Sequence, residues 1–154
     1  MDIFISMLRG INVSGQKKII MTDLKQLFEG LGFDKVQTYI QSGNVIYKTD
    51  EKDTVLISKK ISDAIKLKYD FDVPVITLPN KELKNAALNN PYSQSVEIEK
   101  LAIAFLANVP EMDRLQSIEK EKYLPDTFHF EGKNLYLHIE SGFGRTKLSN
   151  NFFE

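Results

Sequence analysis

The first eighty residues most constrain the fold, because the spacing of their apolar residues switches between that of strands and that of helices in a recognisable order. Residues 2–8 are an almost continuous apolar run, rich in β-branched and aromatic side chains, which predicts a buried strand. A helix is predicted from Thr22, a favourable N-cap residue, to the glycines that flank Leu31. Its apolar residues recur at i, i+3, i+4 and i+7, which indicates one core-facing stripe.

The same order continues with a hairpin, a second helix and a fourth strand. Residues 35–48 predict the hairpin, with Gly43-Asn44 as a two-residue turn. Residues 54–68 predict the helix, and residues 73–78 predict a strand whose early proline favours an edge position. The sequence β-α-β-β-α-β is that of a ferredoxin-like unit, in which both helices cover one face of an antiparallel sheet.

The second half restarts this order and then stops. A short helix predicted at 80–89 ends the first half. The predicted elements of the second half are a strand at 101–107, a helix after Pro110, a hairpin of residues 127–131 and 134–139 around Gly132-Lys133, and a helix from about Ser149. We therefore predict an α+β fold of two ferredoxin-like subdomains related by duplication, the second lacking its last strand. We take the polar connector at residues 91–99 as the boundary, so the two subdomains span residues 1–90 and 91–154.

Charge and composition limit the classes of partner and compartment. The net charge of −1 indicates no global attraction to nucleic acid or anionic lipid. The chain has no cysteine, which fits a reducing compartment and excludes disulfides and thiolate chemistry. The first residues lack the basic region of a signal peptide, and no apolar run approaches the roughly 20 residues that span a bilayer. We expect a cytoplasmic protein with no membrane partner, monomeric or weakly dimeric.

Three polar segments carry the residues that suit ligand binding. They are residues 9–18, residues 41–44 and residues 142–150. The candidate ligand-binding residues are Arg9, Asn12, Lys17, Gln41, Ser42, Asn44, Arg145 and Lys147. Guanidinium groups match phosphate or carboxylate bidentately, and glycines let backbone N–H groups approach a ligand. We expect the first and third segments to be equivalent loops of the duplicated subdomains that together form one anion-binding surface.

Structural roles explain several of these residues equally well. Asn12 suits an Asx-turn, the glycines suit tight turns, and Gly43-Asn44 suits a hairpin. The loop lacks the Gly-x-x-x-x-Gly-Lys-Ser/Thr pattern of a P-loop, and Gly142-Phe-Gly144 does not extend to a dinucleotide fingerprint. We therefore expect no cofactor.

The two histidines lie on the strands of the second hairpin. With a turn at Gly132-Lys133, His129 lies opposite Tyr136 and His138 lies elsewhere along the strand. No Asp, Glu or Cys residues complete a tetrahedral site beside them, so we expect no metal.

Three sequence strings resemble a known family. Leu8-Arg-Gly-Ile-Asn-Val13 and Thr38-Tyr-Ile-Gln-Ser-Gly-Asn-Val45, followed by Gly144-Arg-Thr-Lys-Leu-Ser-Asn150, resemble the bacterial domain-of-unknown-function family 1697. The resemblance runs from Ile3 to the last residue and implies an α+β fold of two related subdomains. It implies no established activity. Ser14 stands where the family more usually has a glycine, and the family usually continues beyond residue 154 with more helix and a further strand.

Three functional hypotheses follow from these residues. The first is binding of an anionic or phosphorylated small ligand at the arginine- and glycine-rich loops. The second is a nucleic-acid-binding module that uses the same cations, and the third is a protein-interaction module with an exposed sheet edge. The residues do not distinguish binding from turnover, so enzymatic activity stays open.

Overall fold

The computed structural model describes residues 1–41, 43–94, 97–149 and 152. They form an α+β fold with two antiparallel sheets, of four and three strands, and four helices. The chain divides into two units, Met1–Lys84 and Asn85–Glu154, which are described separately below. None of the helices in the described residues is long and apolar enough to cross a membrane.

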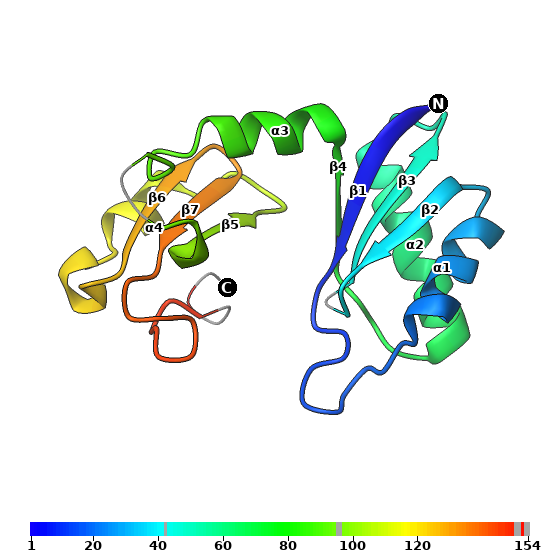
Figure 1. The fold of residues 1–154 in the computed structure, drawn as a ribbon, viewed down its shortest axis with the longest axis horizontal. Helices are drawn as coiled ribbons and strands as arrows, with labels where there is room; N and C mark the ends of the chain where they lie inside the picture. The colour runs from blue at the N-terminus through cyan, green and yellow to red at the C-terminus, as the bar shows by residue number, and fades with distance from the viewer. Residues whose placement is uncertain (42, 95–96, 150–151, 153–154) are drawn as a thin grey trace. The chain divides into compact units, whose positions relative to one another are not determined.

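The first unit follows the predicted order of elements (Figure 1). Its elements are β1 (Asp2–Leu8), α1 (Met21–Gly30), β2 (Asp34–Tyr39), β3 (Asn44–Thr49), α2 (Thr54–Tyr69) and β4 (Val75–Pro79). The strands lie in the order β2-β3-β1-β4, with every neighbouring pair antiparallel. β4 lies at an edge, as the proline near its start predicted.

Both helices of the first unit pack on one face of its sheet (Figure 1). The alternation of β1 sends Phe4, Ser6 and Leu8 to this face. The residues buried with them include Leu24 and Phe28 of α1, Ile57, Ile61 and Ile65 of α2, and Val45 and Tyr47 of β3. The one-sided helical stripes predicted from periodicity therefore do form the core.

A chain of buried hydroxyl groups crosses this core. The Ser6 hydroxyl lies 2.7 Å from the Tyr47 hydroxyl and 2.8 Å from that of Thr77, which accepts a hydrogen bond from Ser58 at 2.8 Å. Burial raises the pKa of Tyr47, and its hydrogen bonds with Ser6 and Thr77 partly offset the rise. Each hydroxyl finds its partner on a different strand or helix, so the chain links sheet to helix.

The second unit is built from short elements. It begins within α3 (Asn80–Leu88) and continues with β5 (Leu101–Phe105), α4 (Met112–Gln116), β6 (Thr127–Glu131) and β7 (Asn134–His138). The sheet order is β5-β7-β6, and both pairs are antiparallel. One face of this sheet forms a core from Phe128, Leu135, Leu137, Ile139 and Leu148.

On the opposite face Tyr136 is buried, and its hydroxyl donates a hydrogen bond to the carbonyl of Ala86 at 2.9 Å. This contact joins the end of α3 to the sheet. The second hairpin has the predicted two-residue turn, because Glu131 lies opposite Asn134 and Gly132 has a φ of 60°. His129 lies opposite Tyr136, as predicted.

Three local predictions are wrong. Helix α1 begins at Met21 and its N-cap is Ile20, which has no side-chain capping bond, so Thr22 is not the cap. In the first hairpin Tyr39 lies opposite Asn44, which leaves a four-residue loop in place of a two-residue turn. Strand β5 ends at Phe105 and not at residue 107. The predicted helix from Ser149 falls largely outside the described residues.

Candidate functional site

The long loop after β1 packs against the hairpin loop that joins β2 to β3. The Leu8 N–H donates to the Gly43 carbonyl at 3.0 Å, and the Asn12 side-chain amide donates to the Gln41 carbonyl at 3.1 Å. The first two of the strings that resemble the family therefore meet in space. We call residues 9–19 together with residues 40, 41 and 43 the loop cluster.

Asn12 holds the loop cluster closed. Its Nδ2 donates to the Ile19 carbonyl at 3.0 Å, and its Oδ1 accepts from the Ile19 N–H at 2.9 Å. Its own backbone N–H donates to the Lys17 carbonyl at 3.1 Å. The Asn12 side chain thus pairs with the backbone of Ile19, seven residues further on, and not with a near neighbour as in an Asx-turn. Its role in ligand binding stays a prediction.

Lys17 is also anchored to the protein. Its Nζ donates to the backbone carbonyl of Asp72 at 2.6 Å, which ties the loop to the segment before β4. The Arg9 N–H donates to the carbonyl of Pro74 at 3.0 Å and fixes the other end of the loop to the same segment. The side chains of Lys17 and Asn12 are therefore engaged in holding the loop.

Gly43 lies close against the β1–α1 loop. It has a φ of +86°, and a Cβ placed there would lie 2.8 Å from Ile11 Cδ1 and 2.9 Å from Leu8 Cβ. Glycine is therefore required here both by the left-handed backbone and by the approach of the β1–α1 loop.

Ile40, in the same hairpin loop as Gly43, has a φ of 48° although it is β-branched. Its side chain is 60% exposed. Such a conformation is strained and persists only where the surroundings impose it.

The outer surface of the cluster combines cationic and apolar side chains. Arg9, Lys18 and Gln41 are exposed. Four large apolar side chains of the cluster and its flanks are 57% to 66% exposed: Val13, Ile20, Tyr39 and Ile40. Asn44 is half-buried at the start of β3, between Tyr39 on one neighbouring strand and Met7 on the other.

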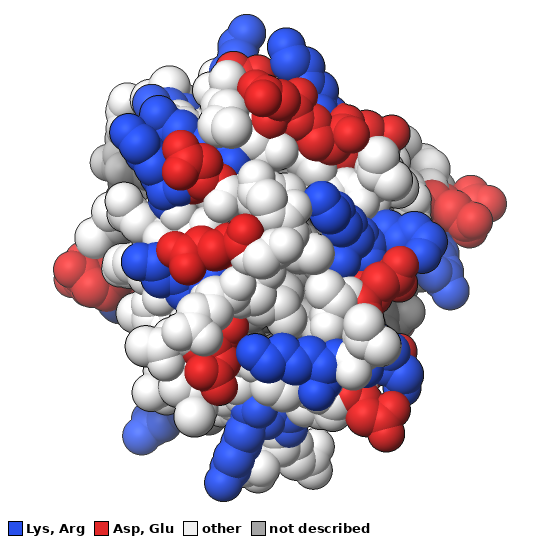
Figure 2. Space-filling view, turned by 90° about the vertical axis from the view of Figure 1, so that its right-hand side faces the viewer, with Lys and Arg blue, Asp and Glu red and all other residues white. Residues whose placement is uncertain are grey.

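The β1–α1 loop and its flanking residues carry positive charge without acidic residues between them. Residues 3–22 contain Arg9, Lys17 and Lys18 and no Asp or Glu. On the face of the molecule drawn in Figure 2, by contrast, Lys and Arg side chains are interspersed with Asp and Glu. The β1–α1 loop therefore differs from such mixed surface in carrying one sign of charge.

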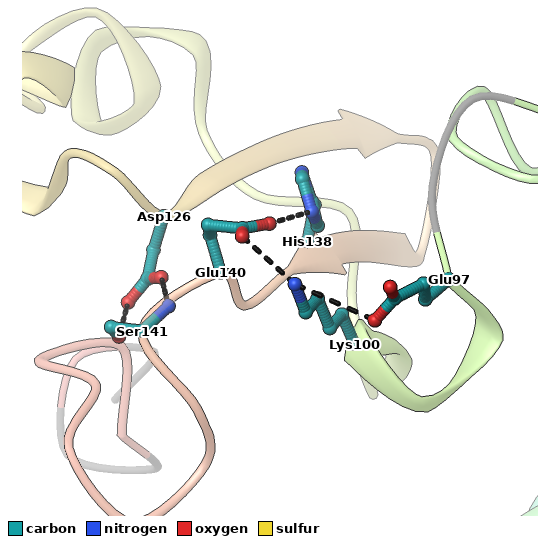
Figure 3. A network of polar contacts seen from close by, with 6 residues as sticks. All are labelled: Glu97, Lys100, Asp126, His138, Glu140 and Ser141. Carbon is teal, nitrogen blue, oxygen red and sulfur yellow. Dashed lines mark hydrogen bonds and ion pairs between the residues drawn. The ribbon is translucent and has the colours of Figure 1, made fainter.

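The glycine-containing loop of the second unit is held by Asp126, which is 3% exposed. The Asp126 carboxylate accepts hydrogen bonds from the Ser141 N–H at 2.8 Å and the Ser141 hydroxyl at 2.6 Å (Figure 3). Burial acts to raise the pKa of Asp126, but hydrogen bonds from Ser141 and Thr146 outweigh it, so the pKa lies below its usual value. Asp126 is a residue that the sequence analysis did not single out.

Arg145 and Lys147 lie exposed on this second loop, and the backbone N–H groups of Arg145 and Thr146 both donate to the Gly142 carbonyl. The loop follows β7, the last strand of its unit, whereas the loop cluster follows β1, the first strand of its own. The strand order thus does not support the prediction that the two loops are equivalent.

Next to this loop lies an ion-pair network that sequence analysis missed (Figure 3). Lys100 Nζ donates to Glu140 at 2.8 Å and lies 3.5 Å from Glu97, while His138 Nε2 lies 3.1 Å from the other Glu140 oxygen. The hydrogen bond between Lys100 and Glu140 raises the pKa of Lys100 and lowers the pKa of Glu140. His138 and Glu140 are two residues apart, a spacing that can bring side chains together at a strand end.

Among the described residues, no three His, Asp or Glu side chains are grouped so that they could hold an ion.

The second unit also contains a cleft of about 650 Å³. It is bounded by residues 106–111, by Arg114 and Leu115 of α4, and by Phe130 and Phe152. Its lining is about equally polar and apolar and carries two opposite charges, from Arg114 and Glu111. No local motif marks it, because its walls come from separate elements.

The predicted site residues divide between the units. Arg9, Asn12, Lys17, Gln41 and Asn44 lie at or beside the loop cluster of the first unit. Arg145 and Lys147 belong to the second unit, and Ser42 lies outside the described residues. A ligand site shared by the two loops stays a prediction.

The fold is one that is already known. The chain is similar to the conserved bacterial protein SP0830 from Streptococcus pneumoniae, with a TM-score of 0.77 and 21% sequence identity over 99% of this chain and 86% of that chain. The family model described as "Protein of unknown function (DUF1697)" matches residues 1–136. The chain therefore belongs to this family, as the sequence strings predicted. The comparison with curated proteins finds no match.

Proposed function

We propose that the loop cluster of the first unit binds a small anionic ligand, with phosphorylated compounds as the preferred class. The observation that carries the proposal is a cationic loop held in one conformation by the Asn12 hydrogen bonds. A preorganised loop loses little conformational entropy on binding, so more of the contact energy appears as affinity.

Arg9 and Lys18 supply the charge in this proposal. Both are exposed, and no acidic residue lies between residues 3 and 22. A guanidinium can bind two phosphate oxygens in parallel, whereas an ammonium contributes a point charge. Arg9 is therefore assigned the orienting contact and Lys18 a supporting one. Asn12 and Lys17 act indirectly, by holding the loop.

Arg145 and Lys147 extend the proposal to the second unit. They are exposed on a loop that Asp126 holds in place, so they also present fixed positive charge. We propose that they bind the same class of anionic ligand as the loop cluster. This extension is tested separately from binding at the loop cluster itself.

The arginines of the chain, Arg9, Arg114 and Arg145, provide a matched experiment. Inorganic phosphate and pyrophosphate are titrated into each Arg→Gln variant, and binding is followed by calorimetry and by amide chemical shifts. Each variant removes one positive charge, so a difference in affinity between the variants shows which arginine lies near the bound anion. We expect Arg9→Gln to weaken pyrophosphate binding about tenfold, the loss of one charge-assisted contact.

The outcomes separate the alternatives. Arg114→Gln is the control and should bind like the unaltered protein. Weakening by both Arg9→Gln and Arg145→Gln supports anion binding at the loops of both units. Weakening by Arg9→Gln alone restricts the site to the loop cluster. Unchanged binding in Arg9→Gln contradicts the proposal, and weakening by Arg114→Gln moves the site to the cleft of the second unit.

A nucleic-acid ligand is the second candidate, and Tyr39 favours it. Its ring is 64% exposed at the end of β2, and exposed aromatic rings stack on unpaired bases. This candidate predicts binding of oligouridylate that weakens steeply between 50 and 200 mM salt and is reduced by Tyr39→Ala. Affinity that is independent of salt and of Tyr39 would exclude it.

We also infer that the two units share a ferredoxin-like ancestry, the second without its last strand. The order β2-β3-β1-β4 is supported as ferredoxin-like by its antiparallel pairing and by helices on one face. The order β6-β7-β5 repeats its first three strands in the same arrangement. A sequence profile built separately from each unit should then detect the other.

A further inference from the structure

Three large apolar side chains of the loop cluster and its flank lie in solvent. Val13 is 57% exposed, Ile20 is 66% exposed and Ile40 is 60% exposed. By contrast, Ile11 and Ile19 of the same cluster are buried in the core of the first unit. The β1–α1 loop extends beyond the end of its sheet (Figure 1). We call Val13, Ile20 and Ile40 the loop patch. Single exposed apolar residues are common, whereas a group of them marks an interaction site.

Hydrogen bonds of one side chain bring the loop patch together. The Asn12 Nδ2 donates to the carbonyls of both Ile19 and Gln41. Each member of the loop patch is the chain neighbour of one of these three residues. Because consecutive Cα atoms are about 3.8 Å apart, the Cα atoms of the loop patch all lie within roughly 10 Å of the Asn12 amide nitrogen. One ligand can therefore contact more than one member of the patch.

Ile40 is the member whose exposure the fold explains least. Its φ of 48° lies in the left-handed region, which β-branched residues rarely adopt. The close packing of Gly43 against Leu8 and Ile11 fixes the backbone of this loop, which explains how the strain persists. It does not explain why the side chain is apolar, since asparagine would fit both the backbone and the exposure better. An exposed apolar side chain on a strained backbone points to contact with a ligand.

The loop patch lies beside positive charge. Arg9, Lys17 and Lys18 belong to the same loop, and residues 3–22 contain no Asp or Glu. The Lys17 Nζ donates to the carbonyl of Asp72, so its charge is held in place. An apolar surface next to fixed positive charge complements a molecule that has both an anionic group and a hydrocarbon group. Inorganic phosphate would use only half of this surface.

We propose that the ligand of the loop cluster is a phosphate monoester that carries a hydrocarbon group. This inference rests on the proposed function, to which it adds the apolar part of the ligand. The phosphate binds the cations of the loop through charge-assisted contacts, and the hydrocarbon loses contact with water against the loop patch. The net charge of −1 gives the whole chain no attraction to an anionic bilayer, so the proposed occupant is a soluble ester and not a membrane surface.

A series of esters separates the two parts of the ligand. Methyl, butyl and hexyl phosphate carry the same charged group and differ only in the length of the hydrocarbon. Their binding to the full chain is followed by calorimetry and by amide chemical shifts. We expect hexyl phosphate to bind at least about tenfold more tightly than methyl phosphate, because its longer chain loses more contact with water. Its chemical-shift changes should include Val13, Ile20 and Ile40.

Ile40→Asn tests the loop patch without harming the fold. The variant removes an apolar side chain, and asparagine adopts a positive φ more readily, so its melting temperature should rise. We expect the ratio of hexyl to methyl phosphate affinity to fall at least about threefold. Misfolding cannot explain weaker binding by a more stable variant. Val55→Asn is the matched control, because Val55 is also β-branched and is 76% exposed in the first turn of α2. It should leave the ratio unchanged.

The outcomes distinguish this inference from the proposed function. If methyl phosphate binds and hexyl phosphate binds no more tightly, the inference is overturned and the anion site stands. If no ester binds, or if Arg9→Gln leaves binding unchanged, both are overturned. A ratio that Ile40→Asn does not lower, or that Val55→Asn lowers equally, also overturns the inference. Sedimentation of the chain with phosphatidic acid vesicles, without binding of soluble hexyl phosphate, overturns it in favour of a membrane surface.

Discussion

Asn12 and Ile19 exchange two hydrogen bonds across the long loop after β1. The Asn12 Nδ2 donates to the Ile19 carbonyl at 3.0 Å, and the Ile19 N–H donates to the Asn12 Oδ1 at 2.9 Å. The same amide reaches the Gln41 carbonyl in the neighbouring hairpin loop. One side chain therefore closes the loop and docks it, and the shape of the proposed ligand surface depends on it.

Replacing Asn12 should destabilise the first unit. Asn12→Ala leaves two carbonyls and one N–H without their partner and keeps a φ of 55°, so we expect a loss of about 2–3 kcal/mol. Asn12→Asp retains the acceptor but cannot donate, and it should lose a similar amount. Urea denaturation gives the free energies. A loss below about 0.5 kcal/mol for both variants would contradict the assigned role of the amide.

Gly43 and Gly15 should respond differently to the same substitution. Both have positive φ, but a Cβ at residue 43 meets Ile11 and Leu8, whereas residue 15 has nothing within 4 Å. Gly15→Ala should cost about 1–2 kcal/mol from the backbone alone, and Gly43→Ala a further 1–3 kcal/mol or so from overpacking. Thermal and urea unfolding measure both. Equal costs would show that the loop does not pack on residue 43.

The buried hydroxyl chain should behave as a coupled unit. Ser6→Ala removes the common partner of the Tyr47 and Thr77 hydroxyls, and we expect a loss of about 1–3 kcal/mol. Tyr47→Phe should cost about 1 kcal/mol, and the double variant less than the sum of the two. A double-mutant cycle by chemical denaturation measures the coupling. Strict additivity would mean that the 2.7 Å contact between these hydroxyls contributes nothing to stability.

Asp126 should make stability depend on pH in the acidic range. Its pKa is lower in the folded than in the unfolded protein, so the unfolded state binds the proton first as pH falls. The stabilisation is therefore fully present above the unfolded pKa of about 3.9 and is lost as pH falls through the lower folded value. The free energy of unfolding is compared at pH 6 and below pH 4 for the unaltered chain and Asp126→Asn.

Asp126→Asn should cost about 2 kcal/mol at pH 6, because Ser141 loses a charged acceptor, and the difference should shrink in acid. Ser141→Ala is the matched control, since it removes the hydroxyl bond but keeps the backbone bond to Asp126. A difference that is constant with pH would contradict the assigned protonation state.

Elements that depend on local pattern were predicted closely. The helix expected at residues 54–68 is α2, Thr54–Tyr69, because its apolar stripe and the capping Asp53 are close in sequence. The hairpin around Gly132-Lys133 was predicted with its register, since a two-residue turn dictates the opposite partners. The turn of the first hairpin was not predicted correctly, because the conformation of its loop depends on the β1–α1 loop, which packs against Gly43.

The sequence by itself determined the order of strands and helices, the core-facing residues and the family, because apolar periodicity and short strings are properties of neighbouring residues. Tertiary structure alone decided the roles of the polar residues. Asn12 bonds the carbonyl of Gln41, 29 residues away, and Lys17 bonds that of Asp72, 55 residues away. A side chain that suits ligand binding suits a backbone carbonyl equally well. Only the folded chain, which brings distant carbonyls within reach, selects between the two.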